Sequence, residues 1–98
     1  MKTALVTGAS SGIGLVVARE LAREGWRVIA QGRDAARADA AMADIKAAAP
    51  DARIDMLLAD LSEMANVSRF ADQVGELTDR IDLLVNNAGF TPAKRVET

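Results

Sequence analysis

Short apolar runs recur along the chain with longer joining segments between them, and this alternation constrains the fold more than any other feature. The runs are residues 4–6, 28–30, 54–59 and 81–85. Each is only a few residues long, which is typical of buried strands. The joining segments are long enough for helices. Strands that alternate with helices form right-handed βαβ units, so the sequence predicts an α/β fold: a parallel sheet with helices on both faces.

The joining segments carry helix signals of their own. In the first, apolar side chains that share one helical face are predicted to face the core: Ile13, Val16, Val17, Leu21 and Ala22. Asp34 is predicted to cap a second helix that runs to about Ala48, ahead of Pro50. Ser62 is predicted to cap a third, amphipathic helix.

The first strand is joined to the first helix by a turn, residues 7–14, that contains Gly8, Gly12 and Gly14. Gly8 permits a sharp exit from the strand, Gly12 lets a phosphate approach the backbone, and Gly14 lets the helix pack close to the sheet. The start of the helix offers unpaired N–H groups to an anion, and Ser10 and Ser11 add hydroxyls. The alternative is a tight turn without a ligand. A flavodoxin-like fold is disfavoured because the first strand ends without acidic residues.

This turn resembles the cofactor turn of the short-chain dehydrogenases/reductases over its whole length. Two further segments lie at the spacing found in that family: Asp60-Leu61 after the third strand and Asn86-Asn87-Ala88-Gly89 after the fourth. Right-handed crossovers and the glycine-rich first turn favour strand order 3-2-1-4, and the resemblance implies a Rossmann-type, doubly wound parallel sheet. It also implies that residues 1–98 are a single dinucleotide-binding domain, the N-terminal part of a longer domain. The fourth strand is then an apolar edge that a larger protein would cover with a fifth strand, so the chain looks cut short.

The resemblance assigns cofactor contacts residue by residue. Asp60 would accept a hydrogen bond from the adenine amino group, although it could instead cap the following helix. Asn87 and Ala88 would line the adenosine ribose, whereas Asn86 is interpreted as structural. The full set of expected cofactor-binding residues is Gly8, Ser10, Ser11, Gly12, Ile13, Gly14, Arg33, Asp60, Leu61, Asn87, Ala88 and Gly89.

The end of the second strand favours NADP(H) over NAD(H). An NAD-binding enzyme places an acid there for the ribose hydroxyls, and an Arg accommodates the 2′-phosphate of NADP. Here Gly32 stands at the position of the acid, and Arg33 follows it. The alternative is a solvated Arg33 paired with Asp34. Many NADP-preferring members also carry a basic residue in the turn, where this chain has Ser11.

In this family a Tyr, a Lys, a Ser and an Asn perform hydride-transfer catalysis on an alcohol or carbonyl substrate. The chain contains no Tyr, Cys or His, and none of its Ser residues fits the catalytic role, so no catalytic residue and no metal site is predicted. The parent protein is expected to be an oxidoreductase, and the chain alone is expected to be inactive. The alternative is a non-catalytic NADP-binding module, or a subunit completed by another chain.

The remaining expectations concern partners and location. A net charge of −2 gives no reason to expect nucleic acid or membrane as a partner. No apolar run approaches a membrane span, and a strand begins too early for a signal peptide, so a cytoplasmic location is expected. The family resemblance implies a homo-oligomeric parent. Gly32-Arg33-Asp34 and residues 95–98 look like the retinol-dehydrogenase-like branch, but the substrate is not predicted.

Overall fold

The computed structural model describes residues 2–10 and 12–87, which form a parallel sheet with helices on both faces. The elements, in chain order, are β1 (Thr3–Thr7), α1 (Gly12–Arg23), β2 (Arg27–Gly32), α2 (Ala35–Ala48), β3 (Ile54–Leu58), α3 (Met64–Leu77) and β4 (Leu83–Asn86).

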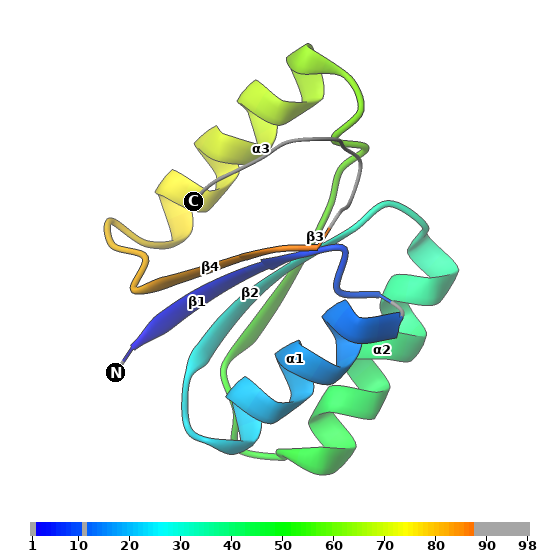
Figure 1. Ribbon diagram of the computed structural model, residues 1–98, viewed down its shortest axis with the longest axis vertical. Helices are drawn as coiled ribbons and strands as arrows, with labels where there is room; N and C mark the ends of the chain where they lie inside the picture. Colours follow the sequence, from blue (N-terminus) through cyan, green and yellow to red (C-terminus); the bar gives the residue numbers. More distant parts are fainter. Residues whose placement is uncertain (1, 11, 88–98) are drawn as a thin grey trace.

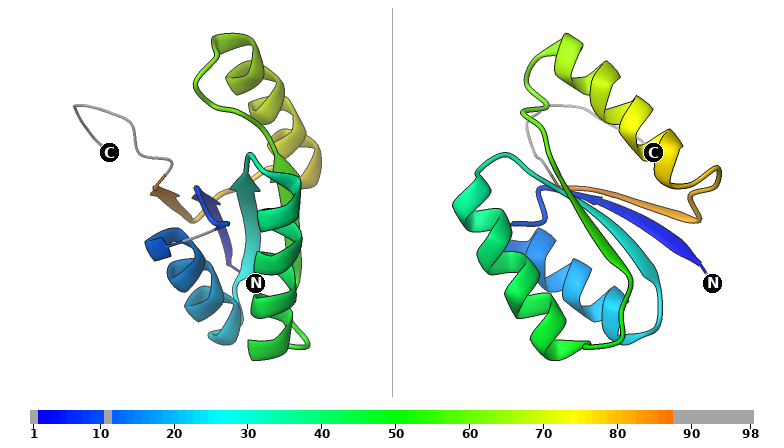
Figure 2. Two further views of the ribbon diagram at one scale, coloured as in Figure 1. Left: turned by 90° about the vertical axis from the view of Figure 1, so that its right-hand side faces the viewer. Right: turned by 180° about the vertical axis from the view of Figure 1, so that it is seen from behind.

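The strand order β3-β2-β1-β4 confirms the predicted doubly wound topology. All three pairings are parallel; at the centre, Ala4 of β1 is in register with Val28 of β2 on one side and Leu83 of β4 on the other. Helices α1 and α2 cover one face of the sheet, and α3 covers the other (Figures 1 and 2). Because the strands are parallel, the turns that follow β1, β2, β3 and β4 gather at one edge of the sheet. We call this side, where the carboxyl ends of the strands lie, the carboxyl edge; it is distinct from the edge strands β3 and β4.

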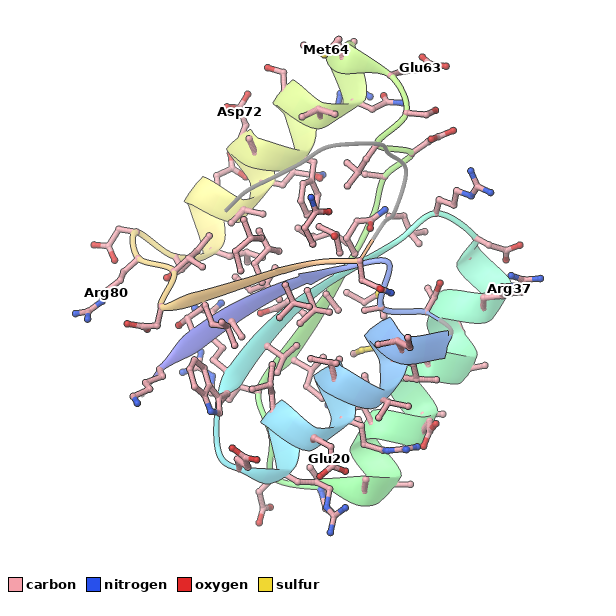
Figure 3. All side chains as sticks on the ribbon, viewed as in Figure 1. Glu20, Arg37, Glu63, Met64, Asp72 and Arg80 are labelled. Atoms are coloured by element: carbon pink, nitrogen blue, oxygen red, sulfur yellow. The ribbon has the colours of Figure 1, made fainter. Side chains whose placement is uncertain are left out.

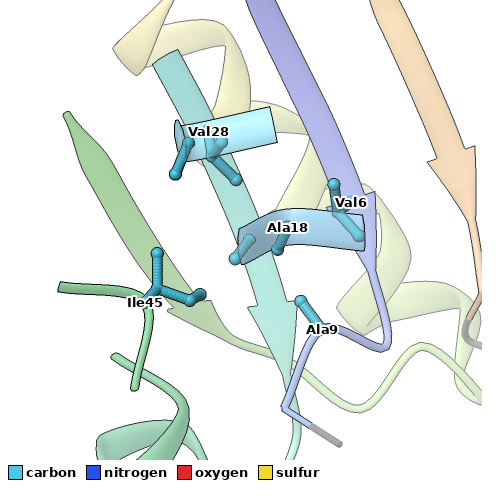
Figure 4. Packing of buried hydrophobic residues seen from close by; sticks show 7 residues of the cluster. Val6, Ala9, Ala18, Val28 and Ile45 are labelled. Atoms are coloured by element: carbon cyan, nitrogen blue, oxygen red, sulfur yellow. The ribbon is translucent and has the colours of Figure 1, made fainter. Parts of the chain in front are cut away.

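The core consists of two layers separated by the sheet. On the side of α1 and α2, Val6, Val28 and Ile45 are fully buried and belong to one cluster (Figure 4). On the side of α3, Leu5 and Ile29 pack with two helix residues. Consecutive residues of a strand thus point into opposite layers, as strand geometry requires. Each fully buried Val or Ile contributes about 1.5–3 kcal/mol of hydrophobic stabilisation.

The predicted core face of α1 was wrong in part. Ile13 and Val16 are 73% and 47% exposed. Ala22 is buried as predicted, together with Gly14 and Ala18, so the buried stripe consists of small residues. This helix lies so close to the glycine turn and the sheet that small side chains line the contact, while the larger Leu15 and Leu21 are only partly buried against the core.

Helix α2 begins and ends as predicted. The carboxylate of Asp34 accepts hydrogen bonds from the N–H groups of Ala36 and Arg37, so Asp34 is the N-cap. Arg19 of α1 and Asp44 of α2 form an ion pair with an Nη1–Oδ2 distance of 3.2 Å, which joins the two helices. Both side chains are partly exposed, so the pair adds at most about 1 kcal/mol.

Strand β4 is an edge of the sheet in the described part of the chain, as the sequence predicts. Leu83 and Leu84 are 37% and 59% exposed, although their side chains are apolar. Unlike β1 and β2, which have a strand on each side, β4 pairs only with β1 among the residues that the structure describes.

In the described part of the chain, no helix combines the length and apolar character that crossing a membrane requires.

Candidate functional site

The glycine turn is anchored on the end of β2. Gly8 and Gly12 have φ angles of 63° and 60°, which lie in the left-handed region that favours glycine. The N–H of Gly8 donates to Oε1 of Gln31 (2.7 Å), and the N–H of Ala9 donates to the carbonyl oxygen of Gln31 (2.8 Å). The turn therefore leaves β1 sharply and crosses over the end of the neighbouring strand.

Gly14 brings the start of α1 against this turn. A Cβ atom placed on Gly14 would overlap the carbonyl oxygen of Gly8 and would lie 2.7 Å from Nδ2 of Asn87. The same Nδ2 donates a hydrogen bond to the Gly8 carbonyl at 3.3 Å. The structure thus brings together three of the predicted site residues, from β1, α1 and the end of β4.

In the described part of the chain, the start of α1 has open space beside Gly12. Helix α1 begins at Gly12, and among the described residues outside its own helix backbone and chain neighbours, no atom lies within 4 Å of the position that a Cβ on Gly12 would occupy. No acidic residue lies in the first turn of this helix, and Ile13 is largely exposed. Unpaired N–H groups and the positive end of the helix dipole can therefore interact with a phosphate here.

The ends of β1 and β4 are tied by the hydroxyl of Thr7, which is buried. Its Oγ1 lies 3.1 Å from Oδ1 of Asn86 and 3.3 Å from the carbonyl oxygen of Val85, and it accepts a hydrogen bond from the N–H of Asn87 (2.9 Å). This agrees with the structural interpretation of Asn86. Thr7 was not among the predicted site residues; its only sequence signal is a hydroxyl residue immediately before Gly8.

Asp60 follows β3 and forms a local turn of its own. Oδ1 of Asp60 accepts hydrogen bonds from the N–H and the Oγ of Ser62, at 3.0 and 2.7 Å. The two bonds from Ser62 lower the pKa of Asp60 below its ordinary value. Burial opposes them by less, and the positive charge of Arg33, which also lowers the pKa, is the smallest contribution. Arg33 and Asp60, which follow neighbouring strands, are therefore close enough to interact electrostatically.

The predicted role of Ser62 as a helix cap was wrong. Helix α3 begins at Met64, and its N-cap is Glu63, whose side chain makes no capping hydrogen bond. Figure 3 shows the side chains of Glu63 and Met64 at the N-terminal end of α3. Asp60 does not cap this helix either. Ser62 instead bonds to Asp60, because an Asp side chain readily accepts a hydrogen bond from the backbone two residues ahead of it. Helix α3 therefore begins after this turn, at Met64.

Replacing Ser62 by Ala is expected to raise the pKa of Asp60 toward its ordinary value, because one of the two hydrogen bonds to the charged form is lost. A folded-state pKa below the unfolded one gives stability that is present above about pH 4 and lost as the pH falls through the folded-state pKa. The variant should lose part of this acid dependence. Carboxyl ¹³C NMR titration measures the pKa directly. Ser68→Ala, at an exposed position of α3, is the control; an equal shift in both variants would contradict the assignment.

Gln31 is a member of the site that the sequence analysis missed. Besides its bonds to the glycine turn, its Nε2 donates to the carbonyl oxygen of Ala59 (2.6 Å), directly before Asp60. The side chain is buried, with 3% of its surface exposed. Gln31 therefore joins the ends of β1, β2 and β3. The only sequence signal was an amide residue between Ala30 and Gly32 at the end of the predicted strand.

The remaining predicted residues divide into two groups. Leu61 is partly buried and packs beneath α3 against the cluster that contains Phe70. Ser11, Ala88 and Gly89 lie outside the described residues. Within the described part of the chain, no group of three or more His, Cys, Asp or Glu side chains is placed to hold a metal ion. The groups of the site that can contact an extended anion are the backbone N–H groups at the start of α1, the hydroxyl of Ser10 and the exposed Arg33.

Comparisons with known proteins agree with this geometry. The chain is 39% identical to human retinol dehydrogenase 13 over 88 residues, which are 90% of this chain and 27% of the human enzyme. Its structure is similar to that of a metagenomic short-chain oxidoreductase in complex with NADP, with a TM-score of 0.81, 38% identity, and coverage of 91% of this chain and 39% of the other. Actinorhodin polyketide ketoreductase with NADPH gives a TM-score of 0.81 at 35% identity, over 91% of this chain and 33% of the ketoreductase.

The chain spans well under half the length of each of these relatives. The names of the relatives include a retinol dehydrogenase and a polyketide ketoreductase, so the named substrates differ. The family model for short chain dehydrogenases matches residues 2–98, which is nearly the whole sequence. Together with the parallel sheet and the glycine turn, this match establishes that the chain belongs to the short chain dehydrogenase family.

Proposed function

We propose that this chain is the NADP(H)-binding part of a longer short-chain dehydrogenase/reductase, which transfers hydride between NADP(H) and an alcohol or carbonyl compound. The family membership supports the reaction class. The relatives are several times longer than the matched segment, and β4 exposes Leu84 at the edge of the sheet. Both observations support a domain in which further strands continue the sheet beyond β4 and supply the catalytic residues.

The observation that carries this proposal is that the glycine turn, Arg33 and Asp60 follow neighbouring strands and so lie together at the carboxyl edge. The turn leaves open space beside Gly12 at the start of α1, which fits a pyrophosphate. Asp60 is ionised and partly exposed, which fits an acceptor for the adenine amino group. When bound, the cofactor supplies the nicotinamide ring that gives or takes the hydride. The residues of this chain bind and orient its adenosine and pyrophosphate.

The preference for NADP(H) follows in this proposal from the end of β2. Gly32 is buried and bears no carboxylate that would accept hydrogen bonds from ribose hydroxyls or repel a phosphate. Arg33 is exposed at the same edge, where its guanidinium can pair with a 2′-phosphate through two parallel hydrogen bonds. The NADP and NADPH complexes of similar structures support this assignment.

Replacing Arg33 by Ala tests the cofactor preference in the full-length protein. Loss of a charge-assisted pair should weaken NADPH binding by roughly 10- to 100-fold, whereas NADH binding should change less than about threefold. Titration of each cofactor by calorimetry measures both constants. Arg53→Ala removes the same charge from an exposed position just before β3, at the opposite edge of the sheet, and is the matched control. Equal losses of NADPH affinity in the two variants would show a general charge effect and contradict the proposed contact.

A further inference from the structure

The side chain of Ser10, in the glycine turn, covers the position where β2 would carry an acid in an NAD-binding enzyme. A Cβ atom placed on Gly32 would lie 3.1 Å from Cβ of Ser10 and 3.2 Å from its Oγ. Both distances are shorter than ordinary van der Waals contacts. A Cβ at position 32 would therefore crowd Ser10, and one of the two would have to shift by a few tenths of an ångström, while the neighbouring Ala38 of α2 leaves an ordinary distance of 3.8 Å.

Ser10 has little freedom to retreat from this contact. The residue before it, Ala9, is completely buried, and its N–H is bonded to the carbonyl oxygen of Gln31 at 2.8 Å. Gly8 is held in turn by the Gln31 side chain. Rotation about the side-chain bond can move the Oγ of Ser10 away, but the position of its Cβ is set by the anchored backbone. The Cβ–Cβ contact is thus the part of the overlap that cannot relax cheaply.

We propose that Ser10 is a specificity-determining residue: its Cβ occupies the space that a carboxylate-bearing side chain at position 32 would need, and so keeps the ribose pocket suited to a 2′-phosphate. This inference rests on the proposed NADP(H) function and deepens it. Selectivity then depends on a contact between the turn and the end of β2, in addition to Arg33. Substituting Gly32 alone does not convert the site to NAD(H), because the new carboxylate is displaced from the ribose.

The test compares variants of the full-length protein by their dissociation constants for NADH and NADPH. Gly32→Asp alone is expected to lose NADPH affinity through charge repulsion without gaining NADH affinity. Adding Ser10→Gly removes the blocking Cβ, so the double variant should bind NADH about tenfold more tightly than Gly32→Asp, the gain expected for charge-assisted hydrogen bonds to the ribose. Adding Ser10→Ala removes only the hydroxyl and is the matched control. Because the Cβ remains, this double variant should bind NADH no better than Gly32→Asp.

A second measurement reports on the contact without any cofactor. Gly32→Ala should lower the melting temperature of the protein, and the decrease should be smaller in a Ser10→Gly background than in a Ser10→Ala background. The inference is overturned if Gly32→Asp alone binds NADH as tightly as the Ser10→Gly double variant, or if the Ser10→Ala and Ser10→Gly double variants behave alike. A wild-type protein that binds NADH as tightly as NADPH would instead overturn the proposed cofactor preference. The NADH comparison between double variants would still decide the role of Ser10.

Discussion

Gly14→Ala is expected to destabilise the fold by about 2–3 kcal/mol and to weaken NADPH binding roughly a hundredfold. The new methyl group would overlap the carbonyl oxygen of Gly8 and crowd the amide of Asn87. Both partners are held by the sheet: Gly8 is bonded to Gln31, and Asn87 follows β4. The helix must therefore move away from the turn. The phosphate-binding N–H groups of α1 would then lose their alignment with the turn.

Helix propensity alone predicts the opposite result, because Ala is better than Gly inside a helix by about 1 kcal/mol. Gly75→Ala is therefore a matched control: Gly75 lies in α3, and no atom of another described part of the chain lies within 4 Å of its Cβ position. This variant should be more stable than the wild type by about 0.5–1 kcal/mol and should bind NADPH normally. Urea unfolding and NADPH titration measure both effects. If Gly14→Ala unfolds at the same urea concentration as Gly75→Ala, the close approach of α1 to the turn is contradicted.

Gln31→Leu is expected to cost about 2–4 kcal/mol of stability, because it leaves two backbone groups without partners. The N–H of Gly8 loses its acceptor, and the carbonyl oxygen of Ala59 loses its donor. Leu has a similar volume and is apolar, so the loss cannot be assigned to a cavity. The same change removes the side-chain link between the glycine turn and the end of β3. The turn is then held less firmly, so NADPH affinity should also fall.

The control for this prediction is Gln73→Leu in α3. Gln73 is half-buried, and its side chain makes no hydrogen bond to any residue that the structure describes. Its replacement should change stability by less than about 0.5 kcal/mol. The difference between the two urea midpoints at equal slopes measures the contribution of the Gln31 bridge. Similar midpoints for the two variants would show that the bridge adds nothing to stability.

Most of the architecture could be predicted from the sequence, because it depends on local patterns. The period of the apolar residues distinguishes strands from helices, and the handedness of the βαβ crossover restricts the strand order. Both predictions are confirmed by the order β3-β2-β1-β4. The cap at Asp34 was also predictable, since a side chain bonds backbone groups only two and three residues ahead. The open turn at Gly12 follows from the glycine spacing in the same way.

Other features depend on residues that lie far apart in the sequence. The sequence analysis expected Ile13 and Val16 to be buried in α1, but the close approach of the helix to Gly8 and Asn87 buries Gly14 and the small residues in line with it. Periodicity identifies the possible faces of a helix, whereas the distance to its neighbour decides which face fits. That distance is set by how the sheet holds the turn.

The cofactor site likewise depends on contacts between residues that lie far apart in the sequence. The sequence by itself determined which residue types stand at the ends of the strands: the glycines of the turn, Arg33 and Asp60. Only the tertiary structure decided how these ends are joined, through Gln31 to residues 23 and 28 positions away in the chain, and how closely Ser10 approaches the space beside Gly32. Such contacts are fixed by the register between parallel strands, which brings together groups that no local pattern connects.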